Sequence, residues 1–189
     1  MSAQDSKLFV ISGPSGAGKG TLVTCVRERR SNLGLTVSAT TRAPRKGEVD
    51  GVNYFFLTRE EFDRRVANGE FVEWAEVHGN CYGTLVSEVQ SKLASGASLI
   101  LEIDVQGALQ VKERFPEAVL IFIKPPSLEV LRERLVGRGT ETPETIELRM
   151  ANAADELALA DRYDDVVVND DLDRATDELV RVLDMHERI

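Results

Sequence analysis

The sequence is poor in the residues that build disulfide and metal frameworks. Its 189 residues include only two cysteines, Cys25 and Cys81, and two histidines. The cysteines lie far apart along the chain. Small disulfide-bonded domains and structural zinc sites need more of these ligands, at closer and regular spacing. We therefore expect neither a disulfide framework nor a zinc centre.

Long apolar segments and an excess of positive charge are also missing. Apolar runs reach only about six residues, far below the length of a membrane-spanning helix. The first residues lack the apolar segment of a secretory signal, so we expect a cytoplasmic protein that does not bind membranes. The formal net charge of −9 argues against broad binding of nucleic acid or anionic lipid.

The basic residues that are present occur in two local groups. One group comprises Arg42, Arg45 and Lys46, and the other comprises Arg132, Arg134 and Arg138. An otherwise acidic chain that concentrates its arginines in this way is suited to small anionic ligands.

Apolar runs predict an α/β fold with a parallel core sheet. Four runs, at 8–11, 99–103, 118–123 and 166–168, are continuous rather than alternating, as in strands covered on both faces. The stretch from about 35 to 83 breaks this rhythm. It contains closely spaced strand patterns at 35–39, 54–57 and 71–77 and a capping pair, Thr58 and Glu61, that starts a helix.

Helix signals divide the rest of the chain. Ser87 with Gln90, Ser127, and Thr142 with Pro143 are each predicted to start a helix, and a last helix begins near Leu172. We expect a core formed by 1–34, 85–125 and 161–189, a small mixed insert at 35–84, and a mobile helical lid at 126–160.

A glycine-rich segment follows the first apolar run. The residues are Gly13, Pro14, Ser15, Gly16, Ala17, Gly18, Lys19, Gly20 and Thr21. Strand, glycine-rich turn, lysine and helix together are typical of a P-loop, whose backbone N–H groups and helix N-terminus surround a polyphosphate. Gly20 departs from the pattern, because a Ser or Thr there would reach Mg²⁺. A plain glycine turn is the simpler alternative.

The insert carries residues suited to a second, phosphorylated ligand. Arg42 and Arg45 lie three residues apart, and Tyr54 and Tyr82 offer phenolic hydroxyls. Arginine forks match phosphate oxygens, although a solvated basic loop would have the same composition. Glu73 is suited to guanine, because one carboxylate can accept both N1–H and N2–H₂, a donor pair that adenine lacks. Taken alone, Glu73 would be read as a surface carboxylate.

Together these segments resemble the guanylate kinase family over nearly the whole chain. The stretches that carry the resemblance are 13–19, 38–45, 47–51, 73–75, 82–84, 104–107 and 168–172. The resemblance implies a three-layer P-loop NTPase fold with a GMP-binding insert and a helical lid. It also implies that Arg42, Arg45, Tyr54 and Tyr82 hold the GMP phosphate.

The remaining roles implied by the resemblance concern the base, the metal and catalysis. Ser38, Glu73 and Thr84 would read the guanine, Asp104 would lie beside the nucleoside, and Asn169 near the adenine of ATP. Thr84 stands where family members often have Ser, which keeps the hydroxyl. Lys19, Arg42 and the lid residues Arg134, Arg138 and Arg149 would neutralise charge during phosphoryl transfer.

Metal binding is expected at the end of the strand 99–103. Glu102 and Asp104 lie where open α/β sheets bind ligands, and carboxylates there suit a hydrated Mg²⁺. Thr21 is the third candidate, and water is expected to mediate these contacts. Either acid alone would serve equally as a turn cap.

The function expected is transfer of the γ-phosphoryl group of MgATP to GMP, with dGMP as a further acceptor, giving GDP and ADP. Two alternatives remain at this point. One is a non-catalytic, guanylate-kinase-like module that binds a peptide in the insert cleft, and the other is a kinase for a ribosyl phosphate. The sequence leaves the oligomeric state open.

Overall fold

A five-stranded parallel sheet forms the centre of the molecule. The computed structural model describes residues 6–77, 79–137 and 142–187. The strand order is β2-β7-β1-β8-β9, with all neighbours parallel. The strands are β1 (Leu8–Ser12), β2 (Gly34–Leu35), β7 (Leu99–Glu102), β8 (Val119–Lys124) and β9 (Asp165–Val168). This confirms the predicted parallel core.

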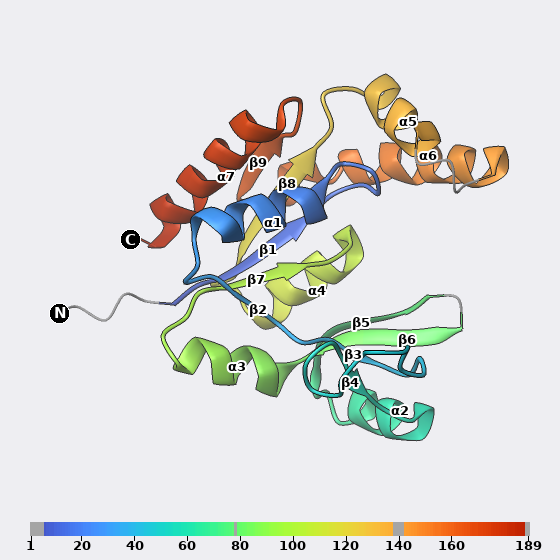
Figure 1. Cartoon of the computed structure of the whole chain (residues 1–189), viewed down its shortest axis with the longest axis vertical. Coiled ribbons are helices and arrows are strands. Elements are labelled where there is room, and N and C mark those ends of the chain that lie inside the picture. The colour runs from blue at the N-terminus through green and yellow to red at the C-terminus, as the bar shows by residue number, and fades with distance from the viewer. Residues whose placement is uncertain (1–5, 78, 138–141, 188–189) are drawn as a thin grey trace.

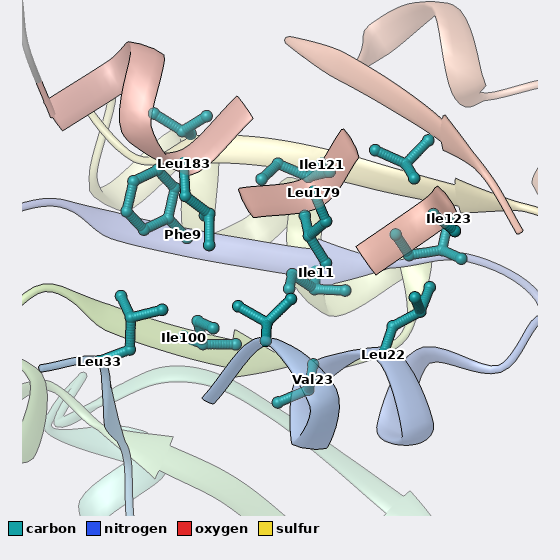
Figure 2. Packing of buried hydrophobic residues seen from close by; sticks show 14 of the residues in the cluster. Phe9, Ile11, Leu22, Val23, Leu33, Ile100, Ile121, Ile123, Leu179 and Leu183 are labelled. Carbon is teal, nitrogen blue, oxygen red and sulfur yellow. The ribbon is translucent and has the colours of Figure 1, made fainter. Parts of the chain in front are cut away.

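Helices cover both faces of this sheet (Figure 1). One face packs against α1 (Lys19–Arg29) and α7 (Leu172–Glu187) through Phe9, Ile11 and their neighbours (Figure 2). The other face packs through Leu8 and Val10 against α3 (Val86–Ala94), α4 (Val105–Arg114) and the segment after the short 3₁₀ helix η1 (Ala160–Arg162). Successive residues of β1 thus serve opposite faces, as the pleat of a strand requires.

The insert forms a separate four-stranded mixed sheet with the order β4-β3-β6-β5. Its strands are β3 (Ala39–Thr40), β4 (Phe55–Phe56), β5 (Phe71–Val77) and β6 (Asn80–Leu85), and α2 (Arg59–Ala67) packs on them. The single strand expected at 35–39 is wrong. Leu35 pairs with β7 of the central sheet, whereas Ala39 pairs with β4 and β6 of the insert. The chain changes sheets between these two residues.

The segment predicted to form a lid contains α5 (Leu128–Gly137) and α6 (Pro143–Leu157), and we keep the name lid for these two helices. Leu131, Leu135 and Ala153 form a small buried cluster of their own, with Met150 packed against it. In Figure 1 the two helices project from one end of the central sheet, on the side opposite the chain termini. Within the described residues, no helix is long and apolar enough to cross a membrane.

Capping residues explain where most helices begin. Thr58 accepts from Glu61 N, Thr142 accepts from Thr145 N, and Ser127 accepts from Val130 N, as predicted. The prediction for Ser87 is wrong, because α3 already begins at Val86 and its N-cap, Leu85, makes no side-chain cap. The backbone N–H of Val86 instead donates to Glu70 O, which ties the start of α3 to the insert.

Candidate functional site

The loop between β1 and α1 is folded tightly against the ends of two other strands. Gly13 and Gly18 have φ angles of 140° and 91°, which side-chain-bearing residues rarely adopt. A Cβ on Gly13 would lie 2.3 Å from Ile123 O, and one on Gly18 would lie 2.3 Å from Asn169 Nδ2. Glycine is therefore required at both positions, both for the turn and for the close approach of β8 and of the residue that follows β9.

Lys19 closes the same loop at the first residue of α1. Its Nζ donates to the carbonyls of Gly13 at 2.6 Å and Pro14 at 3.1 Å. A cavity of ≈ 330 Å³ opens in front of it, lined by Ser15, Gly16, Gly18, Lys19, Gly20, Thr21 and Glu102. A lysine at a helix N-terminus facing a cavity is suited to an anionic ligand.

Glu102 and Thr21 both line this cavity, whereas Asp104 has a different contact. A Cβ on Gly20 would lie 3.5 Å from Glu102 Oε1, so the side chain missing at position 20 leaves space beside this carboxylate. Partial desolvation raises the pKa of Glu102, and the charge of Lys19 opposes that shift. Asp104 caps α4 by accepting from Gly107 N at 2.7 Å. The capping role named as the simpler alternative is thus present.

Residues from the lid and the last strand contact the outer side of the loop. Asn169 Nδ2 donates to Ala17 O at 2.8 Å, and Arg134 Nη2 donates to Asn169 O at 2.8 Å. Arg149 Nη1 donates to Ser15 Oγ at 2.5 Å. Arg134 and Asn169 also line a second cavity of ≈ 410 Å³. Arg134 also donates through Nη1 to Ala17 O at 3.5 Å, so two of the three predicted lid arginines contact the loop. The third, Arg138, lies outside the described residues.

The predicted phosphate-binding arginine of the insert is held by a glutamate that sequence reasoning missed. Arg42 Nη2 donates to both carboxylate oxygens of Glu48, at 2.9 and 3.0 Å, and Nη1 donates to Ala43 O at 2.8 Å. Glu48 also accepts from the backbone N–H of Arg45 at 2.7 Å. The hydrogen bond from Arg42 holds the pKa of Glu48 below its usual range.

Two tyrosines, Tyr54 and Tyr82, lie beside Arg42. The guanidinium carbon of Arg42 lies 5.4 Å from the centre of the Tyr54 ring, and the rings of Tyr54 and Tyr82 meet edge to face with centroids 6.2 Å apart. The side chain of Arg45 is exposed nearby. Arg42, Tyr54 and Tyr82, which are separated by up to 40 residues in the sequence, are thus brought together, and their binding of a phosphate stays a prediction.

Glu73 and Thr84 face each other on adjacent strands. They are register partners on β5 and β6, and the fully buried Thr84 Oγ1 donates to Glu73 Oε1 at 2.8 Å. Burial raises the pKa of Glu73, and the nearby charge of Asp104 raises it further. Ser38 is half-buried between β2 and β3, and its carbonyl accepts from Phe55 N at 2.9 Å.

Glu73 of the insert and Asp104 of the core lie next to each other at the first turn of α4. A Cβ on Gly107 would lie 3.3 Å from Asp104 Oδ1 and 3.5 Å from Glu73 Oε2. The carboxylates of Glu73 and Asp104 therefore flank the same glycine in the first turn of α4. One of them projects from the insert, and the other belongs to the core.

The sequence did not single out Glu156, a carboxylate of the lid that lines a cavity together with Asp104. Glu156, near the end of α6, has its pKa raised by burial and by Asp104, while the charge of Lys19 opposes the shift. Glu156 also lines a cavity of ≈ 420 Å³ between β5, the start of α4 and α6, together with Asp104 and Asn152. Helical periodicity alone does not distinguish this glutamate from the exposed ones of α6.

Comparison with known proteins finds relatives that are similar to this chain in sequence and in fold. A family model described as "Guanylate kinase" matches residues 5–186. A guanylate kinase of Halalkalibacterium halodurans is 52% identical over 183 residues, covering 97% of this chain and 90% of the relative. One of Gloeobacter violaceus is 57% identical over 178 residues, covering 94% of this chain and 87% of the relative.

A solved structure is also similar along nearly the whole chain. The crystal structure of guanylate kinase from Anaplasma phagocytophilum superposes with a TM-score of 0.72 at 38% sequence identity. The match covers 96% of this chain and 86% of the other.

Proposed function

The chain belongs to the guanylate kinase family and phosphorylates GMP with ATP, and we propose how its own residues divide that reaction. The observation that carries the proposal is the pair of facing sites. A P-loop with Lys19 lies on the core, and a carboxylate–hydroxyl pair, Glu73 and Thr84, lies on the insert. Each matches the distinguishing chemistry of one substrate.

ATP is bound by the P-loop. Backbone N–H groups at the end of the glycine-rich loop and the N-terminus of α1 face its phosphates, and Lys19 contributes a point charge there. The cavity that contains Arg134, Asn169, Asp170 and Leu172 provides room for the adenine on the outer side of the loop. The half-exposed Leu172 offers it an apolar contact.

GMP is bound by the insert. Arg42, Arg45, Tyr54 and Tyr82 bind its phosphate, because arginine forks and phenolic hydroxyls donate to phosphate oxygens. Glu73 accepts N1–H and N2–H₂ of guanine, and Thr84 holds the carboxylate in place. Ser38 and Asp104 contact the base and the nucleoside. A base without that donor pair leaves the partly buried carboxylate with fewer hydrogen-bond donors than guanine provides, which disfavours its binding.

Phosphoryl transfer needs positioning more than acid–base chemistry. A phosphate oxygen of GMP attacks the γ-phosphorus of ATP, and the bond from that phosphorus to the bridging oxygen breaks, so that ADP leaves with the electron pair. The attacking oxygen is already anionic at neutral pH, so no strong general base is required. Arg134 and Arg149 reach the P-loop from the lid and neutralise charge on the transferred group. The same role for Arg138 remains a prediction.

The donor set beside Lys19 fits a hydrated Mg²⁺. Thr21 and Glu102 would hold the ion on the P-loop side and Asp104 on the α4 side, through water. The described residues contain no group of three or more acidic, histidine or cysteine side chains that could bind a metal by themselves, so phosphate oxygens and water would complete the shell. Bound there, Mg²⁺ neutralises the β- and γ-phosphates. The use of ATP and GMP favours a cytoplasmic location.

An acceptor panel tests the assignment of the guanine site. Phosphorylation of GMP, dGMP, AMP and UMP by MgATP is measured as consumption of the monophosphate, since the spent donor yields ADP in every case, for the wild-type chain and for Glu73→Gln. We expect turnover with the two guanine nucleotides, and a loss of roughly 10- to 100-fold in kcat/KM for GMP in the variant. Glu60→Gln, an exposed change on α2 of the same insert, is the control and should behave like the wild-type chain.

Two results would contradict the proposal. Equal kcat/KM for GMP in Glu73→Gln and the wild-type chain would remove Glu73 from base recognition. Turnover of AMP or UMP comparable to that of GMP would show that the insert does not select guanine.

A further inference from the structure

The insert docks on the core at three consecutive residues of β5. Phe71 belongs to the buried cluster of the insert, whereas Val72, only 3% exposed, belongs to the core cluster that includes Val105, Ala108 and Val111 of α4. Glu73 then faces the first turn of α4. The strand register shifts between Phe71 and Glu73, and such bulges redirect side chains beside functional sites.

A cavity separates β5 from α4 on the outer side of this contact. Its volume is ≈ 350 Å³, and its lining includes Phe71, Glu73 and Trp74 from β5 and Gln110 and Arg114 from α4. Apolar packing is therefore incomplete there. Where side chains do not fill the space between β5 and α4, a hydrogen-bonded contact between them has more influence on their separation than it would have within a packed core.

Arg114 forms that bridge at the C-terminal end of α4. Its guanidinium donates through Nη1 to the carbonyl of Phe71 and through Nη2 to the carbonyl of Gly69. Gly69 has a φ of 67°, and a Cβ there would lie 3.2 Å from Arg114 Nη2, so the turn before β5 fits closely around the guanidinium. One rigid fork thus binds two carbonyls of the insert.

We propose that Arg114 is a positioning residue for guanine recognition, which acts by holding β5 so that Glu73 faces Asp104. The two ends of α4 contact the same strand. The first turn carries Asp104 and Gly107 opposite Glu73, and the last turn binds the carbonyls just before Glu73. Helix α4 therefore fixes the distance between the two halves of the nucleoside site. The inference rests on the guanine-binding role proposed above for Glu73.

The test compares kinetic constants of Arg114→Met with those of the wild-type chain, with GMP and MgATP varied separately. We expect KM for GMP to rise roughly 3- to 10-fold, because two charge-assisted hydrogen bonds at a partly exposed site are lost. The KM for MgATP and kcat at saturating GMP should change less than about 2-fold, since the P-loop and lid contacts remain.

Lys112→Met is the matched control on the same helix. Lys112 Nζ donates to Ala118 O at 2.7 Å and pairs with Asp164, both within the core. Its loss should lower the melting temperature and leave KM for GMP unchanged. If Arg114→Met does not fold, Arg114→Lys carries the same test, because lysine keeps the charge but lacks the planar fork.

A double-mutant cycle separates positioning from general destabilisation. If Arg114 acts through Glu73, then Arg114→Met should raise KM for GMP in the wild-type background and have little effect in Glu73→Gln. An unchanged KM in Arg114→Met, or an equal rise in both backgrounds, would overturn the proposal while leaving the guanine site in place. A Glu73→Gln variant that binds GMP like the wild-type chain would overturn the guanine assignment itself, and the positioning role with it.

Discussion

Glu73, for which we propose a guanine-binding role, lies in an unfavourable position for a charge. Burial and the neighbouring Asp104 both disfavour its ionised form, so its pKa lies above the usual value. Only the ionised carboxylate accepts both guanine donors. If GMP binds as proposed, its hydrogen-bond donors offset part of the free energy that the fold loses by burying this charge.

The pH dependence of GMP binding follows from this shift. As pH falls through the raised pKa of Glu73, the carboxyl gains a proton, and we expect KM for GMP to rise. The same fall in pH weakens GMP binding but makes the free protein more stable against unfolding. Because the pKa is higher in the folded than in the unfolded state, protonation of Glu73 favours folding.

The measurement is a profile of KM for GMP from neutral to acidic pH, with Glu73→Gln as the control. The variant cannot titrate at this position, so its profile should lack the inflection assigned to Glu73. The same inflection in the variant would assign it to another group.

Single residues were predictable where their chemistry is distinctive and their surroundings are local. Lys19 and the glycines of the P-loop belong to one short segment, whereas the guanine-binding role of Glu73 stays a prediction. Glu48 and Arg114 were not predicted, because neither contact follows from a sequence pattern. Glu48 reaches Arg42 across a turn, and Arg114 binds backbone carbonyls, which carry no mark in the sequence.

Among the elements, helices were easier to predict than short strands. Caps at Thr58 and Thr142 depend on residues three positions apart. By contrast, β2, β3 and β4 are two residues long, and their pairing depends on partners far away in the sequence. The start of α3 was misplaced because Val86 is held by Glu70 O, a tertiary contact that overrides the capping signal of Ser87.

The N-terminus of α6 depends on its cap. Thr142 Oγ1 accepts from Thr145 N, with Pro143 at the first helical position. Thr142→Ala should destabilise this end of α6 by about 1 kcal/mol. Amide hydrogen exchange within 143–149 should accelerate about 5-fold, which is the same free energy expressed as a rate.

Thr58→Ala, which removes the corresponding cap of α2, provides the comparison. Its effect should appear in 59–65 and leave α6 unchanged. Faster exchange in both helices for either variant would mean that the caps act on the whole fold and not on the helices they begin.

At the scale of the whole molecule, the insert and the lid are attached differently. The core parallel sheet and its two covered faces were predicted from continuous apolar runs. The way in which the insert and the lid are attached to the core was not predicted. For the insert, it depends on which buried cluster Val72 joins. Val72 extends from the insert into the core, whereas Leu131, Leu135 and Ala153 of the lid pack on one another.

This difference predicts two distinct unfolding phenotypes. Val72→Ala should lower the free energy of global unfolding by roughly 2 kcal/mol, because it opens a cavity in the core cluster. Leu135→Ala should instead increase hydrogen exchange in α5 and α6 with a smaller effect on the denaturant midpoint. Equal midpoint shifts in the two variants would show that lid and core unfold as one unit.

The separate apolar cluster of the lid also bears on how this protein can be recombined with its relatives. Helices α5 and α6 bring most of their own packing partners, so they can be exchanged as one piece provided that Leu131 and Leu135 still fit against Gly16. The insert cannot be exchanged in this way. A β5 transplanted from a relative would have to pack on the α4 of this chain, where the contacts involve Val72, Arg114 and Gly107. A working chimaera therefore has to take α4 and β5 from the same protein.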